Sequence, residues 1–138
     1  MGRRDKPGDD ILFKGPTVNI WLVVAAVNGF LAVAAGAFAT HGLHDRMDPH
    51  ALAIFEMGAR YQMYHALAMG LAALASRNSA ARLACMFFLA GIILFSGSLY
   101  LLPLTGARAF GYVTPFGGLA FLLGWMALAW SAARTTAA

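Results

Sequence analysis

The stretch that decides the fold is GIILFSGSLYLLPLTGARAFGYVTPFGG, residues 91–118. It begins as an apolar run, passes through Ser96-Gly97-Ser98 to a turn rich in proline and glycine, and then opens a second apolar run. This pattern predicts two helices joined by a short connection. The residues before it supply two further apolar segments, and the residues after it complete a fourth.

The composition of the 138 residues indicates that lipid is the solvent. Hydrophobic residues make up 60% of the chain and charged residues 12%, and the mean hydropathy is +0.67. Soluble domains carry about 25% charged residues, so this chain has about half of the usual number, which leaves too little polar surface to face water. The net charge of +4 is scattered over loops and termini without a basic stripe, and we therefore expect no nucleic-acid partner.

These features predict an all-α membrane protein, a bundle of four transmembrane helices. The expected spans are residues 17–39, 60–75, 81–102 and 115–131, within a membrane domain at 17–134 that follows a flexible polar tail at 1–16. A cleaved signal peptide is the rival interpretation of the first span, because Ala37-Phe38-Ala39 resembles a cleavage site. The apolar run is longer than the roughly 7–15 residues of a signal sequence, which favours a retained helix.

Two connections have recognisable helix starts. Asp48 and Pro49 predict an N-cap and a first helical position. A helix from there to residue 75 would measure roughly 40 Å, so residues 49–59 are expected to lie at the interface as an interfacial helix. Residues 103–114 are expected to form the last turn, with Thr114 as N-cap and Pro115 at the first position of the final helix.

The distribution of Lys and Arg predicts that both termini lie in the cytoplasm. With four spans, seven of the ten basic residues fall on the side of the N-terminus, the 76–82 connection and the C-terminus. The remaining three, Arg46, Arg60 and Arg108, fall on the opposite side.

Small residues at helical spacing predict close contacts between helices in lipid. In the first span Gly29 lies four residues after Ala25, and Gly36 four residues after Ala32. The same role is expected for Gly91, Gly97, Gly117 and Gly118. Asn28 is the polar exception in the first span and is expected to face a neighbouring helix, because an unpaired amide in lipid is costly.

Three motifs together resemble a known family of small membrane proteins: GAFATHGL at 36–43, YQMYHALA at 61–68, and FSGSLYLLPLTG…GYVTPFGG across 95–118. With Gly124-Trp125, they resemble domain-of-unknown-function family 423, which includes YgdD-type bacterial proteins and transmembrane protein 256 of animals. The usual first motif reads GAFGAHGL, so Ala39 and Thr40 depart from it. The resemblance implies a four-helix inner-membrane protein, and it brings no established biochemical activity; some members have been linked to envelope integrity.

His65 is the most informative polar residue, because ionisable groups at membrane depth usually face the bundle interior. One interpretation is a proton relay or a ligand contact. The other is a neutral histidine that bonds Ser96, Ser98 or Tyr100 of the third span. The full set of candidate interhelical or ligand contacts is Asn28, His41, Tyr61, Gln62, His65, Ser96, Ser98 and Tyr100.

Catalytic and metal chemistry have little support in the sequence. His41 and His44 are weak candidates for a transition-metal site, and the alternative is that His41 caps the first helix while His44 is solvated. Ser96-Gly97-Ser98 lies inside an apolar run without the strand-to-helix turn of a nucleophile elbow, and no Asp or Glu lies in any predicted span. We expect neither an enzyme nor a cofactor.

Three functions remain in view. The leading one is an accessory or stabilising subunit of a membrane complex, or an envelope-homeostasis factor, whose partners are membrane lipids and other membrane-protein subunits or further copies of itself. The second is an oligomeric transporter or channel for protons, ions or a small lipophilic molecule that uses His65, Gln62 and Asn28. The third is a metal-binding redox protein based on the outer-side histidines.

Overall fold

A computed structural model of the protein describes residues 18–135, so the polar tail predicted at 1–16 lies outside the described residues. The described residues form four helical rods. The first is α1 (Ile20–Phe38) continued by the π-helical turn η1 (Ala39–Leu43), and the second is α2 (Pro49–Ala75). The third joins α3 (Ser79–Gly91), the π-helical turn η2 (Ile92–Ser96) and α4 (Gly97–Thr105), and the fourth is α5 (Ala109–Thr135).

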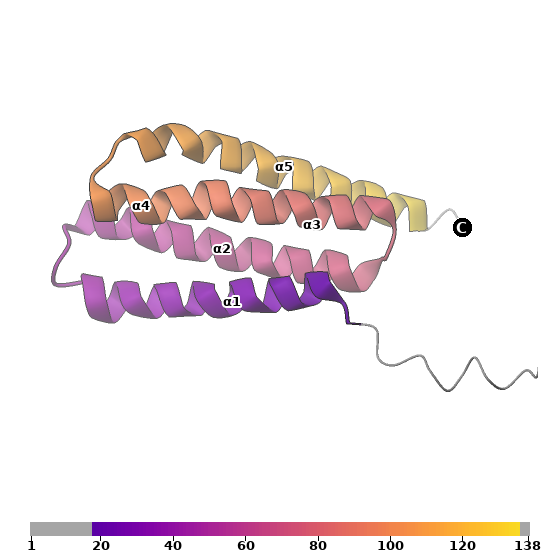
Figure 1. The fold of residues 1–138 in the computed structure, drawn as a ribbon, viewed down its shortest axis with the longest axis horizontal. Coiled ribbons are helices and arrows are strands. Elements are labelled where there is room, and N and C mark those ends of the chain that lie inside the picture. Colours follow the sequence, from indigo (N-terminus) through magenta and orange to yellow (C-terminus); the bar gives the residue numbers. More distant parts are fainter. Residues whose placement is uncertain (1–17, 136–138) are drawn as a thin grey trace, which may run out of the picture.

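The rods lie side by side, with α1 at one edge and α5 at the other (Figure 1). The α3–η2–α4 rod packs against both α2 and α5, whereas α1 packs mainly against α2. The start of α1, the α2–α3 connection and the end of α5 lie at one end of the bundle, and the other two connections lie at the opposite end (Figure 1). The four predicted helices are therefore present, in an arrangement that leaves α1 with one main neighbour.

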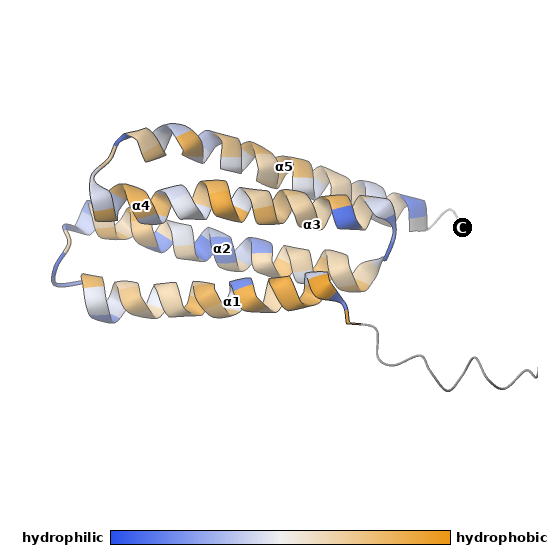
Figure 2. Ribbon diagram, viewed as in Figure 1, coloured by the Kyte–Doolittle hydropathy of each residue, from blue (hydrophilic) through white to orange (hydrophobic). Residues whose placement is uncertain are grey.

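Three rods are long and apolar enough to cross a membrane: Ile20–Leu43, Ser79–Thr105 and Ala109–Arg134. The remaining rod, α2, does not meet this criterion of length and hydropathy. It carries Glu56, Arg60 and His65, and Figure 2 shows its middle as more hydrophilic than α1. Residues 49–75 form one continuous helix of the expected length, so the part expected at the interface, 49–59, and the expected span, 60–75, belong to the same rod. Asp48 caps it as predicted, accepting hydrogen bonds from the backbone N–H groups of His50 and Ala51 at 2.9 and 3.1 Å.

The prediction for residues 103–114 is wrong. Gly106, with φ of 70°, ends α4 in the left-handed conformation, so the chain reverses within residues 106–108. Pro103 lies inside α4, and Pro115 lies inside α5 instead of at its start. Neither proline breaks its helix, because membrane helices accommodate the lost backbone bond with help from neighbouring helices and hydroxyl side chains.

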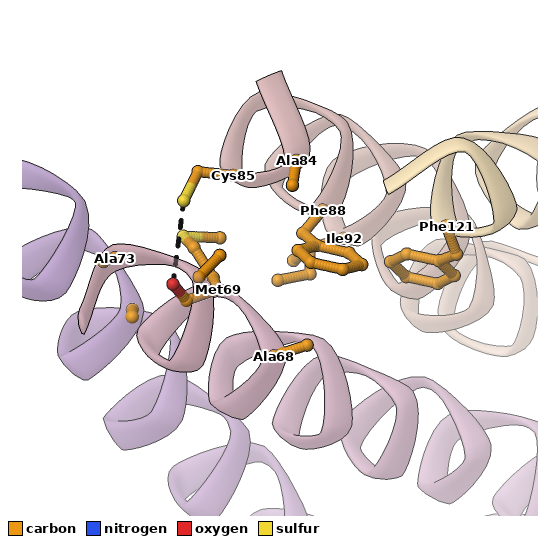
Figure 3. Packing of buried hydrophobic residues seen from close by; sticks show 10 residues of the cluster. Ala68, Met69, Ala73, Ala84, Cys85, Phe88, Ile92 and Phe121 are labelled. Carbon is orange, nitrogen blue, oxygen red and sulfur yellow. Dashed lines mark hydrogen bonds between the residues drawn. The ribbon is translucent and has the colours of Figure 1, made fainter. Parts of the chain in front are cut away.

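The apolar core lies between α2, α3 and α5, toward the end of the bundle that holds the α2–α3 connection (Figure 3). Met69 and Phe88 are fully buried there, and the thiol of Cys85 points across to the carbonyl oxygen of Met69 at 3.6 Å. Alanines on α2 and α3, such as Ala72 and Ala84, fill the space between the larger side chains. A second, smaller cluster around Phe55 and Leu43 closes the opposite end.

Glycines let α5 approach the third rod closely. A Cβ at Gly117 would meet the backbone of Phe95, a Cβ at Gly91 would meet the ring of Phe121, and a Cβ at Gly124 would lie 2.6 Å from the ring of Phe88. We call these three pairs the Gly–Phe seam. Gly118 is in ordinary contact with Phe95 at 4.0 Å, whereas Gly29, Gly36 and Gly97 have nothing within 4 Å of such a Cβ. Gly29, Gly36 and Gly97, predicted as packing positions, therefore make no close contact with another helix among residues 18–135.

Candidate functional site

A chain of buried hydrogen bonds joins three of the rods. The amide of Gln62 on α2 donates to Oδ1 of Asn28 on α1 at 3.3 Å, and it accepts from the hydroxyl of Tyr100 on α4 at 2.7 Å. Asn28 also donates to the carbonyl oxygen of Val24 one turn earlier at 2.9 Å. Since Asn28 and Gln62 are only 8% and 5% exposed, each amide obtains partners that lipid could not provide.

His65 lies one turn further along α2 and faces α5. Its ring is 5% exposed and stacks on Phe121 with centroids 3.4 Å apart. The indole N–H of Trp125 donates to Nε2 at 3.3 Å, and Nδ1 lies 2.8 Å from the carbonyl oxygen of Tyr61. Because an indole nitrogen can only donate, Nε2 accepts and Nδ1 carries the proton, which describes a neutral imidazole.

The predicted bond from His65 to Ser96, Ser98 or Tyr100 is therefore absent, and Trp125 takes that place. The reason is geometric: His65 and Gln62 point in different directions around α2, so Gln62 faces Tyr100 while His65 faces α5. The indole N–H of Trp125 obtains an acceptor in a lipid-filled surrounding, although the ring remains 46% exposed. Trp125 therefore bonds a buried residue while part of its own side chain stays exposed.

The two serines of the FSGS stretch differ in their contacts. The hydroxyl of Ser98 lies 2.7 Å from that of Thr114 on α5 and donates to the carbonyl oxygen of Phe95 at 2.8 Å. Thr114, predicted as an N-cap, instead bonds the carbonyl oxygen of Phe110 one turn earlier at 3.3 Å. Ser96 is fully buried, and its hydroxyl has no hydrogen-bond partner among residues 18–135. Ser96 lies in η2, where the helix changes its hydrogen-bond pattern.

The remaining candidates are spread over the surface. Tyr61 is 38% exposed and packs its ring against Phe95, with centroids 4.9 Å apart. His41 lies in η1 and His44 directly follows it, and both are exposed. No group of three or more His, Cys, Asp or Glu side chains that could hold a metal ion gathers in the part of the chain that the structure describes.

Two asparagines bond neighbouring helices at the end of the bundle opposite the GAFATHGL motif (36–43). Neither of them was predicted from the sequence. Asn78 caps α3 through its Oδ1, which also accepts the hydroxyl of Ser131 on α5 at 2.9 Å. Asn19 caps α1 and donates to the carbonyl oxygen of Ala73 at 3.0 Å. An asparagine before an apolar run signals a helix start, but the second helix that it binds cannot be read from local sequence.

The buried polar side chains hold the helices of the bundle against one another. The polar side chains of the core bond one another, and the one unpaired hydroxyl, Ser96, has no base beside it among the described residues. Nucleophilic catalysis by serine needs such a base within hydrogen-bond reach. Each polar pair instead fixes the position of one helix along its neighbour.

Comparison with known proteins gives consistent matches. The profile of a family described as "Protein of unknown function (DUF423)" matches residues 35–118. The chain is 41% identical over 119 residues to a UPF0382 membrane protein of Haemophilus influenzae, covering 85% of this chain and 96% of that protein. It is 40% identical over 112 residues to the UPF0382 inner membrane protein YgdD of Escherichia coli (79% and 86% covered) and 37% identical over 121 residues to the UPF0382 membrane protein YwdK of Bacillus subtilis (85% and 98% covered). No solved structure matches this chain.

Proposed function

This chain belongs to the DUF423 family of membrane proteins, and on that premise we propose that it is a non-enzymatic accessory subunit of a larger membrane assembly. Its place is the inner (plasma) membrane, where relatives such as YgdD are named as inner membrane proteins. All four rods are proposed to cross the bilayer, α2 being shielded by its neighbours. Partner subunits, or further copies of the chain, would cover the parts of the bundle that its own helices leave open.

The observation that carries this proposal is the open face of α1. Only Ala25, Asn28 and Ala32 of this helix are buried. Gly29 and Gly36 lie seven residues apart, which is about two turns and therefore nearly the same direction. No atom of the described part of the chain, apart from the helix's own neighbouring backbone, lies within 4 Å of a Cβ placed at either glycine. Glycines in this arrangement let a second backbone come close in lipid, where packing and not hydrophobicity drives association.

A groove beside Gly36 extends the same face. It lies between α1 and α2, has a volume of about 510 Å³, and is lined by small residues such as Ala32 and Ala59. Glu56 and Arg60 of α2 border it, so a partner helix would meet polar groups as well as open space. Polar side chains that bond across helices add orientation to close packing.

Substitution at the two glycines tests this proposal. Gly29→Leu and Gly36→Leu add bulk where the chain leaves space, so the protein should still fold while the partner is lost. Ala34→Leu is the matched control, because it lies five residues from Gly29, about 140° around the helix, and is already exposed. Purification from native membranes in mild detergent should recover a fixed companion with the wild type and Ala34→Leu only. Recovery of the same companion with all three variants, or with none of the proteins, would overturn the proposal.

Transport is the second candidate, favoured by the continuous hydrogen-bonded chain from Asn28 through Gln62 to Tyr100. Such a chain could conduct protons if an oligomer opened it to water at both ends. Proton flux into liposomes that contain the purified protein, abolished by Gln62→Leu, would support transport. Flux equal to that of empty liposomes would leave the accessory role as the better proposal.

We also propose that both chain ends face the cytoplasm. Arg77, Arg82 and Arg134 lie at the end of the bundle that holds the α2–α3 connection and the end of α5 (Figure 1). Short loops rich in Lys and Arg remain on the cytoplasmic side during insertion. Alkaline phosphatase fused to residue 138 should stay inactive and a fluorescent protein fused there should be bright; the reverse pattern would contradict this orientation.

A further inference from the structure

A groove on the face formed by α3 and α5 has a volume of about 780 Å³. Its floor consists of apolar side chains from both helices, among them Leu83, Met86, Leu123 and Met126. Trp21 of α1 and Trp130 of α5 complete its sides. This volume is within the range of about 300–1,000 Å³ that is typical of small-molecule sites.

The charge of the groove is confined to one end. Arg82 lies in the first turn of α3 and Arg134 in the last turn of α5, and both line the groove. The Arg134 guanidinium lies 5.4 Å from the centre of the Trp130 ring, which holds the cation at the groove's edge. No carboxylate is present among the described residues that line it. An apolar cleft with two unopposed cations at its mouth is complementary to an amphiphile with an anionic head.

The length of the groove fits one leaflet of a bilayer. Leu123 precedes Arg134 by eleven residues, so the apolar floor extends about 16 Å from the cationic end along α5. A hydrocarbon core is about 30 Å thick, and one leaflet therefore occupies about half of it. Tryptophan and arginine are the residues that meet headgroups at that boundary.

We propose that this groove is a binding site for an anionic glycerophospholipid, with its phosphate between Arg82 and Arg134 and its acyl chains along Leu83, Met86 and Leu123. The site is separate from the α1 face to which the partner subunit is assigned, so the two proposals can fail independently. The lipid belongs to the leaflet at the end of the bundle that holds the α2–α3 connection. Lipid bound there would join the ends of α3 and α5 from outside, next to the bond between Asn78 and Ser131.

Binding of defined lipids to the purified full-length protein tests the proposal. Native mass spectrometry in detergent, with added phosphatidylglycerol or phosphatidylcholine, should show one tightly held phosphatidylglycerol and weaker binding of the zwitterionic lipid. Arg82→Gln with Arg134→Gln should weaken phosphatidylglycerol binding about thirtyfold, since each arginine near a surface contributes about a fivefold factor toward anionic lipid. Arg46→Gln with Arg108→Gln, which removes the same charge from the opposite end, is the matched control and should bind like the wild type.

Two further variants separate the site from general attraction and from misfolding. Arg82→Lys with Arg134→Lys keeps both charges and should retain most of the binding if the double glutamine variant loses it. Met86→Trp fills the apolar floor and should weaken binding with both arginines in place. The proposal would be overturned by an equal loss of phosphatidylglycerol binding in the two glutamine double variants, or by equal binding of phosphatidylglycerol and phosphatidylcholine. A companion protein that occupies the groove in place of lipid would also overturn it.

Discussion

Glycine is used in opposite ways on the two sides of this bundle. In the Gly–Phe seam between the third rod and α5, each glycine lies directly under a phenylalanine of the neighbouring helix. On α1, Gly29 and Gly36 each follow a small residue, Ala25 or Ala32, at the four-residue spacing of a packing motif, yet nothing among residues 18–135 fills the space above them. The difference shows that small residues in a membrane helix indicate close approach without indicating whether the neighbour belongs to the same chain.

The neighbours of each rod explain the difference. The third rod packs against both α2 and α5, and Gly91 of this rod lies under Phe121 of α5, while α1 packs mainly against α2. Large apolar side chains such as Phe30 and Val33 on α1 remain 74% and 61% exposed. In lipid these side chains need no cover, but a glycine gains nothing from lipid contact and favours a helix partner. The following variants, in order of their expected effect on stability, test whether the two sets of glycines, those of the Gly–Phe seam and those on α1, differ in this way.

Gly117→Ala should have the largest effect on folding. The added Cβ would fall on the backbone of Phe95, which cannot move without shifting η2. Overpacking of this kind costs about 3 kcal/mol, measurable as a loss in the free energy of unfolding in a detergent titration. The neighbouring Gly118→Ala is the control, because its Cβ would be 4.0 Å from Phe95 and should leave stability unchanged. Equal effects of the two variants would show that the seam is not a tight contact.

Gly124→Ala should be milder because its obstacle can move. The new Cβ would lie 2.6 Å from the ring of Phe88, a side chain that can rotate at a cost of about 1 kcal/mol. Combining it with Phe88→Leu removes the clash, so the double variant should lose less stability than the sum of the two single variants. Strict additivity in this double-mutant cycle would mean that Gly124 and Phe88 do not interact.

Tyr100→Phe should cost less again. It removes the hydroxyl that donates to Gln62 at 2.7 Å while the ring keeps its contact with Phe55. Hydrogen bonds between membrane helices contribute about 0.6 kcal/mol on average, and a loss of that size is expected in the same unfolding titration. Tyr112→Phe, on a side chain that is 79% exposed, serves as the comparison and should have no effect.

Gly29→Leu and Gly36→Leu should have the smallest effect on the isolated chain. Both positions are open, so the change in unfolding free energy should stay within about 0.5 kcal/mol, as for surface substitutions. A loss similar to that of Gly117→Ala would remove the distinction between the two sets of glycines. The outer face of α1 would then be part of the fold instead of a surface for a partner.

Sequence reasoning identified the helices well because their signals are local. The four apolar stretches appear as rods, and Asp48-Pro49 starts α2 as the capping pattern predicts. The same reasoning failed at Pro115, which signals a helix start in water but lies inside α5. In a membrane the cost of leaving the helix is greater, since any backbone group released there has no water to bond.

The polar contacts were harder to predict because their partners are distant in the chain. His65 was expected to face the bundle interior, but its partner Trp125 lies 60 residues away and nothing local links the two. Gln62 offered the better clue, since an amide has a donor and an acceptor and must satisfy both in lipid. Gln62 bonds both Asn28 and Tyr100. The sequence places these two residues on separate helices but does not predict that they share a partner.

The π-helical turn η2 has a consequence for how this family can vary in length. A π-helical turn holds about one residue more than an α-helical turn, and here Phe88 before it packs against Trp125 of α5 while Ser98 after it lies beside Thr114 of α5. Loss of one residue from a regular α-helix turns the whole following segment by about 100°, whereas loss of one residue from 92–96 can be absorbed by a return to the regular α-helical turn. Insertions and deletions of single residues among relatives should therefore gather at 92–96 and at the matching turn at 39–43, where evolution can add or remove a residue and keep the rest of each helix intact.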